Sequence, residues 1–246
     1  MLNKPKILCV ILARGGSKAI PGKNIKHING HPLIAYTIIE ALQSKYIDRV
    51  IISSDSKEIK EQSIKYGAEA PFTRPKHLSG DTAKPVDCIL HATKWAENNQ
   101  NIKYDYVVEL LCTNPFKTTQ DIDNALQMQI ETNADSVIAV TPLSDHHPIR
   151  IKKIVNGKIK DFNSTLVEIP ESRRQDLKPD AYIRCGSIYS MRRDMLEKGI
   201  RYGTNDSRAY IIPSERVINI DEPMDFTIAS FIMEKHPRNY VKPVKI

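Results

Sequence analysis

Acidic residues are missing from the start of this 246-residue chain until Glu40, and cysteine is scarce throughout. The four cysteines include no Cys-x-x-Cys pair, which argues against a zinc site and against a disulfide framework. Three of them, Cys9, Cys88 and Cys112, lie in apolar runs, which predicts reduced core thiols in a cytoplasmic protein. No apolar run reaches the roughly 18 residues of a membrane span, so we expect no contact with a membrane.

One short apolar segment, Ile7–Ala13, follows two lysines near the N-terminus and could be read as a signal peptide. Arg14, Gly15 and Gly16 stand where a small-residue cleavage site would be needed. The segment is therefore interpreted as a buried strand. An apolar content of 41% with 26% charged residues is typical of a globular chain, and the length fits one domain over residues 1–246.

Strand-like and helix-like segments alternate up to Pro142, which predicts an α/β fold with a Rossmann-like, mostly parallel sheet and flanking helices. The expected strands are Ile7–Leu12, Arg49–Ser53, Tyr104–Leu111 and Ser136–Thr141. The expected helices begin at Pro32, after Ser56, at Pro85 and after Thr118.

The pattern changes after Pro142, where residues 143–180 read as a protruding hairpin or arm within the domain. Asn156-Gly157 lies between two alternating stretches and is a strong hairpin-turn signal. The remaining expected elements are strands at Tyr182–Met191, Ala209–Pro213 and Val217–Ile220, and a final helix at Pro223–Lys235.

Positive charge is concentrated near the N-terminus, although the net charge of the whole chain is only +7. Six basic residues precede Glu40: Lys4, Lys6, Arg14, Lys18, Lys23 and Lys26. Four of these six lie in the loop that follows the first expected strand. Because parallel sheets place ligands at the carboxyl ends of their strands, we expect an anionic small molecule there rather than nucleic acid.

The loop from Ala13 to Asn24 reads ARGGSKAIPGKN and matches neither common phosphate-binding motif. Its glycines are adjacent, unlike those of G-x-G-x-x-G, and its second half has one residue too many for a Walker A loop. Glycines nevertheless let backbone N–H groups approach a ligand, and Arg14, Lys18 and Lys23 add three cations. The loop therefore predicts a polyphosphate site.

Eight segments in order resemble the acylneuraminate cytidylyltransferases, which make CMP-activated sialic acids and related nonulosonic acids. They are ARGGSKAIPGKNI from Ala13, GHPLI from Gly30, VIISSDS from Val50, Arg74 to His91, TNPFK from Thr113, His146 to Pro148 with Arg173 to Asp176, GSIY from Gly186 and INIDEPMD from Ile218. The resemblance covers essentially the whole chain.

The resemblance implies a nucleotidyltransferase that pairs as a homodimer through the arm and contributes to cell-surface glycan biosynthesis. It implies CTP as donor, a nine-carbon 2-keto sugar acid as acceptor, Mg²⁺ as cofactor, and pyrophosphate release after the anomeric 2-hydroxyl attacks the α-phosphorus. Nucleotidyl transfer needs mainly alignment and neutralised charge, which cationic side chains provide.

The resemblance also assigns residues. The nucleotide-binding set is Ala13, Arg14, Gly15, Gly16, Ser17, Lys23, Asn24 and Arg74. The catalytic set is Arg14, Lys18, Lys23 and Arg174. The expected sugar contacts are Leu111, Arg173, Arg174 and Gln175, and the expected metal ligand is Asp221.

The chain departs from the family pattern mainly at the sugar end. Leu111 replaces a sugar-contacting Gln, Cys185 replaces an Asn, and Asn219 replaces the first of two aspartates. Ala83 and Pro85 replace hydroxyl residues at the cytosine end. The departures leave sialic, legionaminic and pseudaminic acid open as acceptors.

Three other interpretations remain at this point. The enzyme for the eight-carbon 3-deoxy-manno-octulosonate shares the chemistry, although Lys23-Asn24-Ile25 and the His-His-Pro element favour the nine-carbon group. A basic nucleic-acid-binding α/β module would explain the pI of about 9.1 but not the combination of loop cations with Asp221. An inactive CTP-sensing homologue is the third. A metal site at His146 and His147 is not expected, because adjacent strand residues face opposite sides.

Overall fold

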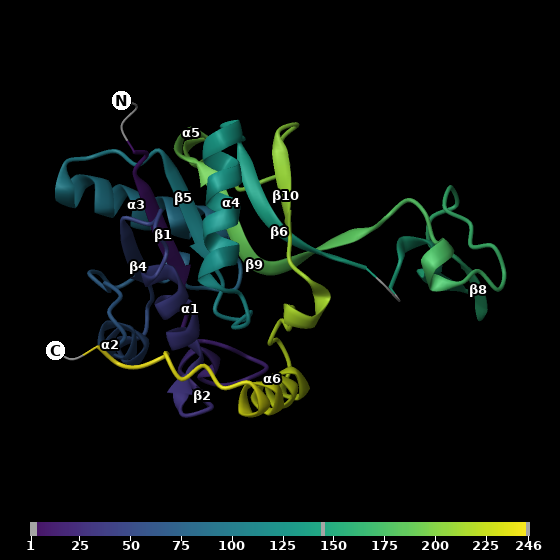
Figure 1. Ribbon diagram of the computed structural model, residues 1–246, viewed down its shortest axis with the longest axis horizontal. Helices are drawn as coiled ribbons and strands as arrows, with labels where there is room; N and C mark the ends of the chain where they lie inside the picture. Colours follow the sequence, from purple (N-terminus) through teal and green to yellow (C-terminus); the bar gives the residue numbers. More distant parts are fainter. Residues whose placement is uncertain (1–3, 144–145, 245–246) are drawn as a thin grey trace.

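The computed structural model describes residues 4–143 and 146–244, which form a twisted sheet covered by helices on both faces (Figure 1). The six-stranded sheet has the order β10-β6-β9-β5-β1-β4. Its strands are β1 (Ile7–Leu12), β4 (Arg49–Ser53), β5 (Tyr106–Leu110), β6 (Ser136–Pro142), β9 (Tyr182–Arg192) and β10 (Ser207–Ile211). Strand β9 runs antiparallel to both neighbours, whereas the other pairs are parallel. The predicted mostly parallel α/β sheet is confirmed.

Two apolar cores lie on opposite faces of this sheet. The helices are α1 (Leu33–Leu42), α2 (Lys57–Lys65), α3 (Pro85–Gln100), α4 (Thr119–Thr132), α5 (Arg193–Glu197) and α6 (Pro223–Lys235). One core joins the sheet to α1, α4 and α6, and the other joins it to α3 and α5. Within the described ranges, no helix is long and apolar enough to cross a membrane.

Strand β1 shows why the sequence gives a continuous apolar run here. Ile7, Cys9 and Ile11 pack into the first core, while Leu8 and Val10 pack into the second. Successive strand residues face opposite sides, so a strand covered on both faces needs apolar side chains at every position. The signal-peptide alternative has no place in this arrangement. All four cysteines are free and buried, which confirms the predicted core thiols at Cys9, Cys88 and Cys112 and adds Cys185 to them.

The helix ends follow the predicted capping residues. Ser56 Oγ accepts a hydrogen bond from the Ile59 N–H at 3.3 Å at the start of α2. Thr118 and Asp121 form a reciprocal capping box at the start of α4. Pro85 occupies the first turn of α3, where its missing N–H costs nothing. The two caps satisfy backbone N–H groups that lack a partner within the helix, Pro85 removes one such group, and all three fix where the helix begins.

The arm leaves the sheet between β6 and β9 and extends away from the body (Figure 1). The N–H of Leu143 donates to the carbonyl of Ala181 at 2.8 Å, so the two ends of the arm lie side by side. The arm carries the hairpin of β7 (Lys152–Val155) and β8 (Lys158–Asp161). Asn156 and Gly157 both have positive φ, 51° and 72°, as the predicted tight turn requires.

One predicted strand is wrong: Val217–Ile220 is extended but forms no strand. Strand β10 already pairs with β6 at this edge of the sheet. Ile220 instead donates its N–H to the carbonyl of Thr113 at 2.7 Å, in the loop after β5. This hydrogen bond fixes the segment between the sheet and α6 against the loop after β5. A small hairpin of β2 (His27–Ile28) and β3 (His31–Pro32) separates the basic loop from α1.

Candidate active site

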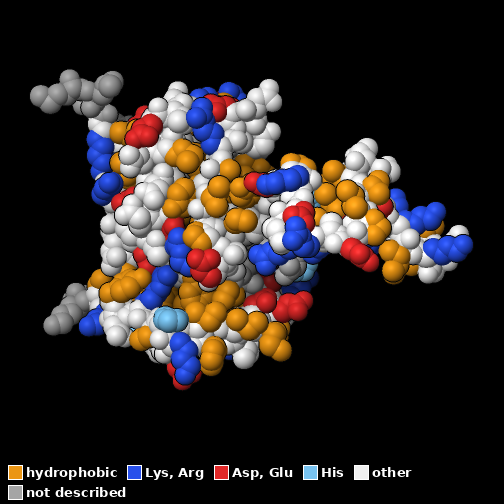
Figure 2. All heavy atoms as spheres, turned by 45° about the vertical axis from the view of Figure 1, so that its right-hand side comes forward, with side chains coloured by type: hydrophobic (Ala, Val, Ile, Leu, Met, Phe, Trp, Pro, Cys, Tyr) orange, Lys and Arg blue, Asp and Glu red, His pale blue; other side chains and the backbone are white. Residues whose placement is uncertain are grey.

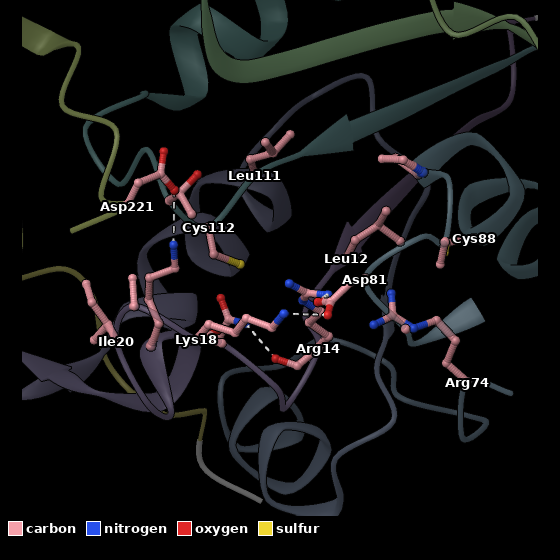
Figure 3. Close-up of a pocket in the computed structure, with 18 of the residues that line it drawn as sticks. Leu12, Arg14, Lys18, Ile20, Arg74, Asp81, Cys88, Leu111, Cys112 and Asp221 are labelled. Carbon is pink, nitrogen blue, oxygen red and sulfur yellow. Dashed lines mark hydrogen bonds and ion pairs between the residues drawn. The ribbon is translucent and has the colours of Figure 1, made fainter. Parts of the chain in front are cut away.

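A cleft of about 620 Å³ opens at the carboxyl ends of β1 and β5 (Figure 3). Its wall is formed by the basic loop after β1, the segment before α3 and the segment before α6. Eight predicted site residues line it: Arg14, Ser17, Lys18, Lys23, Asn24, Arg74, Leu111 and Asp221. The cleft therefore lies where an α/β sheet binds its ligands.

Hydrogen bonds from the backbone give the basic loop its shape. The N–H of Ala13 donates to the Ser53 carbonyl at 3.1 Å, and the N–H of Gly15 donates to Asp55 Oδ1 at 2.9 Å. Asn24 is buried and donates from Nδ2 to the Arg14 carbonyl at 3.2 Å. The Gly15 N–H is thus already bonded within the protein. Gly15 can therefore let a ligand approach the backbone closely, but it offers no free donor.

Glycine at position 15 avoids a tight contact with its neighbour Ser56. A Cβ at Gly15 would lie 3.2 Å from the Cβ of Ser56, whereas a Cβ at Gly16 would meet nothing within 4 Å. Gly22 has a φ of 64°, a conformation that residues with a side chain adopt at a cost. The loop is consequently fixed at both ends and open at Gly16.

Asp81 neutralises two of the loop cations across the cleft (Figure 3). Its Oδ1 accepts from Arg14 Nη1 at 2.9 Å, and its Oδ2 lies 2.6 Å from Lys18 Nζ. These two cations hold the pKa of the Asp81 carboxyl below its usual value. Since Asp81 lies on the segment before α3, these ion pairs bridge the cleft at the position where a negatively charged ligand is expected.

Lys23 and Asp221 form the second charged contact of the cleft. Lys23 Nζ donates to the Ile220 carbonyl at 2.7 Å and to Asp221 Oδ1 at 3.2 Å. The other oxygen of Asp221 accepts from the amide of Asn219. Helix α6 is capped by Glu222 rather than by Asp221. The carboxylate of Asp221 is therefore not needed as a helix cap.

The donor set around Asp221 fits Mg²⁺ bound largely through a ligand's phosphates. No group of three or more His, Cys, Asp or Glu side chains in residues 4–143 and 146–244 forms a ready metal cage. Asp221 is 61% exposed and borders the cleft, so one carboxylate oxygen can reach a bound ion. Mg²⁺ commonly keeps several waters and takes one or two carboxylates plus substrate phosphates.

Arg74 is a buried residue of the cleft wall and is only 5% exposed. Its Nη2 lies 3.9 Å from Asp55 Oδ1, and its Nε donates to Ser79 Oγ at 3.4 Å. Asp55 thus joins Arg74 to the backbone of the basic loop. Arg74 is therefore part of the cleft wall and not a solvated surface arginine.

The departures from the family pattern give part of the cleft an apolar wall. Leu111, Ala83 and Pro85 line it together with Cys88. Cys185 does not line the cleft; it is buried, and its carbonyl accepts from Asn114 Nδ2 at 3.2 Å.

The three predicted residues of the arm are not in this cleft. Arg174 and Gln175 line a second hollow of about 390 Å³ near the base of the arm. Arg173 is exposed and pairs with Asp176 at 2.8 Å. His147 borders the same hollow, and both of its ring nitrogens already form hydrogen bonds, with the Pro179 carbonyl and the Ile149 N–H. Within one chain, the structure separates the arm residues from the phosphate loop.

Two buried charges near the cleft escaped the sequence interpretation. Glu109 is the second-last residue of β5, is 2% exposed and lines the cleft. Burial raises the pKa of its carboxyl, while Arg201 beside it acts in the opposite direction. A charged residue inside an apolar strand is rare, and that rarity was the available signal.

Lys117, the other buried charge, donates to the carbonyls of Leu111 and Asn114 at 2.7 and 2.6 Å and to Thr37 Oγ1 at 2.9 Å. Burial lowers the pKa of Lys117 to about 8. The ammonium group holds the loop after β5, whose first residues line the cleft. Lys117 is the last residue of the TNPFK segment, and nothing in that segment indicated that its side chain would be buried.

Comparison with known proteins agrees with this geometry. The chain is 35% identical over 230 residues to pseudaminic acid cytidylyltransferase of Campylobacter jejuni strain 81-176, covering 92% of this chain and 96% of the relative. It is 30% identical over 239 residues to CMP-N,N'-diacetyllegionaminic acid synthase of Legionella pneumophila, covering 93% and 97%.

A solved structure shares the fold at lower identity. The structure of CMP:2-keto-3-deoxy-manno-octonic acid synthetase complexed with CTP superimposes with a TM-score of 0.69 at 19% identity. The match covers 94% of this chain and 99% of that one. The family model described as cytidylyltransferase matches residues 8–240. The chain therefore belongs to the cytidylyltransferase family and is a nucleotidyltransferase.

Proposed function

We propose that this enzyme transfers CMP from CTP to the anomeric 2-hydroxyl of a nine-carbon 2-keto sugar acid and releases pyrophosphate. The 2-hydroxyl oxygen forms a bond to the α-phosphorus, and the bond between the α-phosphorus and the bridging oxygen breaks. The observation that carries the proposal is the gathering of Arg14, Lys18, Lys23 and Asp221 around one cleft. The identities of 35% and 30% to enzymes for pseudaminic and legionaminic acid support the acceptor class.

The residues of the cleft divide the work between alignment and charge. Arg14, Lys18 and Lys23 are placed to neutralise the triphosphate and the leaving pyrophosphate, which is the main demand of nucleotidyl transfer. Preorganised cations of this kind cost no reorganisation at the moment of reaction. Asp221 and the phosphate oxygens would hold Mg²⁺, which would supply further positive charge to the triphosphate.

In this proposal the base and ribose of CTP bind against a different wall of the cleft from the triphosphate. Arg74 and Ala83 lie on the segment between α2 and α3, and Pro85 is the first residue of α3. With alanine and proline in place of hydroxyl residues, we infer that cytosine is recognised there through backbone groups. Asn24, fixed against the Arg14 carbonyl, positions the end of the loop for the nucleotide.

The arm supports a homodimer as part of the same proposal. Its surface carries five large apolar side chains that are at least 62% exposed: Ile154, Ile159, Phe162, Val167 and Ile169. Figure 2 shows hydrophobic side chains gathered on the arm, with basic side chains towards its end. Apolar groups at this density mark an interaction surface. In a dimer, Arg173, Arg174 and Gln175 would serve a sugar site that one chain does not complete.

We assign the proposed reaction to the cytoplasm, and the free, buried cysteines support this assignment. The test is an incubation with CTP, Mg²⁺ and one of four acceptors: N-acetylneuraminic, legionaminic, pseudaminic and 3-deoxy-manno-octulosonic acid. Pyrophosphate release is measured, with ATP and GTP as control donors. We expect turnover with CTP and at least one nine-carbon acid. Turnover with the eight-carbon acid alone, or equal rates with ATP, would contradict the proposal.

A nucleic-acid-binding role is tested on the same preparation. Duplex binding that weakens steeply with salt would support it. We expect no such binding, because the loop cations face a cleft and are paired with Asp81 and Asp221.

A further inference from the structure

Glu109 is a buried carboxylate at the cleft that the proposed chemistry has not used. In register it lies between Val10 of β1 and Tyr189 of β9, near the centre of the sheet. Burying a charge is costly unless it is paired and hydrogen-bonded. An apolar residue at this position would pack in the sheet without that cost, so the carboxylate invites a functional explanation.

Arg201 holds this carboxylate from one side only. Its Nε donates to Glu109 Oε2 at 2.6 Å, and its Nη2 contacts the same oxygen. The guanidinium lies over the ring of Tyr189, 3.6 Å from its centroid. Among the described residues no hydrogen bond reaches Oε1 of Glu109, although the side chain lines the cleft. The pair therefore presents one fixed, unused acceptor oxygen.

The position of this acceptor points to the second substrate rather than to the nucleotide. The basic loop follows β1, and the N–H of Arg74 donates to the Ser54 carbonyl just after β4, so these nucleotide residues lie towards β1 and β4. Glu109 is on β5, and its partner Arg201 packs on Tyr189 of β9, so the pair lies further towards β9. A group that contacts Glu109 therefore lies on the β9 side of the basic loop.

The charge balance also suits an acidic acceptor. A lone buried carboxylate would repel a sugar acid, but Arg201 offsets the charge of Glu109. Arg184 lies nearby through Tyr202, since its Nη1 donates to the Tyr202 hydroxyl and its guanidinium is 4.7 Å from that ring. The guanidinium of Arg201 is 5.7 Å from the same ring. The cluster has one carboxylate and two guanidinium groups, so it remains net positive.

We propose that Glu109 is a specificity-determining residue for the sugar acid, accepting at Oε1 a hydrogen bond from an N–H or O–H of its ring substituents. Leu12 and Leu111 line the cleft with it and suit the apolar part of an acylamino substituent. Arg201 is the positioning residue that keeps Oε1 turned to the cleft. This inference rests on the proposed function.

Glu109→Gln tests the acceptor oxygen at nearly constant shape. Arg201 would bind the amide oxygen, so the amide NH₂ would face the cleft and oppose a substrate donor. Because this donor would be left without a partner, we expect the KM for the sugar acid to rise by roughly 10- to 100-fold. The KM for CTP should change by less than about 2-fold, on the scale of an unaffected subsite.

Glu97→Gln is the matched control, because Glu97 is 3% exposed and pairs with Arg193 at 2.8 Å but does not line the cleft. It should lower the melting temperature and leave both KM values unchanged. If Glu109→Gln fails to fold, Glu109→Asp keeps the charge and withdraws the oxygen by one methylene. Acylated and deacylated forms of the same acid distinguish N–H from O–H recognition.

The outcomes separate the two hypotheses. An inactive wild-type enzyme with every sugar acid would refute the proposed function. An active wild type with Glu109→Gln kinetics equal to those of Glu97→Gln would refute the inference alone. A relaxed preference for CTP over UTP in Glu109→Gln would also refute it, since Glu109 would then contact the base.

Discussion

Lys23 Nζ lies 3.2 Å from Asp221 Oδ1, although 198 positions separate the two residues in the sequence. The contact joins the phosphate loop to the segment before α6 and closes one end of the cleft. A cation and an anion of the site thus neutralise each other. In the proposed function, binding of Mg²⁺ and a triphosphate would exchange this contact for new ones.

Asp221→Asn should raise the Mg²⁺ concentration needed for half-maximal rate and lower kcat, because the only carboxylate of the predicted metal site is lost. The melting temperature should hardly move, since Glu222 and Asp225 cap α6. Mg²⁺ titration of the initial rate measures the effect. Asp206→Asn, at an exposed aspartate paired with Arg208, is the control. An unchanged Mg²⁺ dependence would remove Asp221 from the metal site.

Asn219→Asp should lower the Mg²⁺ concentration needed for half-maximal rate. Asn219 now donates its amide to Asp221, and an aspartate at this position would offer a second carboxylate instead. Two carboxylates attract a divalent cation more strongly than one. The same titration measures the change, and a higher Mg²⁺ requirement would argue against a shared site.

Arg14→Ala and Lys23→Ala should each lower kcat by roughly 10²- to 10³-fold, the scale of losing one preorganised donor to a transition state. Circular dichroism should be unchanged, because neither side chain is part of the apolar cores. Lys57→Ala on α2, at a side chain 86% exposed, controls for the loss of one positive charge. Near-normal kcat in both loop variants would place the triphosphate elsewhere.

Asp81→Asn should lower the KM for CTP by about 2- to 5-fold, the range expected from exposed ion pairs. The carboxylate competes with the triphosphate for Arg14 and Lys18, and its lowered pKa keeps it ionised throughout the neutral range. Initial rates at low and high salt measure the effect, which should shrink as salt screens the pairs. A raised KM for CTP would instead show that Asp81 assists binding.

Lys117→Met should destabilise the protein by about 1–3 kcal/mol, because buried carbonyls lose their donor. The loss should grow with pH. The folded pKa of Lys117 is about 8, against 10.5 for an ordinary lysine, so the unfolded chain binds more protons between these values. Wild-type stability gains with pH over that window, and the variant lacks this contribution. Urea unfolding of both proteins at several pH values measures the difference; a shrinking difference would contradict it.

Much of the fold was predictable because its signals are local. The run of β1, Ser56 and Thr118 at helix starts, and Asn156-Gly157 in the arm each act over a few residues. The segment Val217–Ile220 was mispredicted because strand formation depends on a free neighbouring edge, which no short pattern reports.

The candidate site was predictable on one side only. Arg14, Lys18 and Lys23 lie close in sequence and form one concave loop. Their ion-pair partners, Asp81 and Asp221, come from distant segments, and the sequence does not report these pairings. Glu109 gave a faint signal as a charge in an apolar strand, but its pairing with Arg201 depends on a contact 92 positions away. Pairings of this kind follow from tertiary packing.

The side-by-side ends of the arm have a consequence for how such enzymes diversify. Because Leu143 and Ala181 are hydrogen-bonded neighbours, the insertion joins β6 to β9 across a short, fixed distance, as a tight turn would. Lengthening a loop twofold costs only about 0.6 kcal/mol in closure entropy, so changes of arm size are tolerated by the body. The length of the arm is thus separable from the geometry of the cleft, provided that the arm residues proposed for the sugar site are kept.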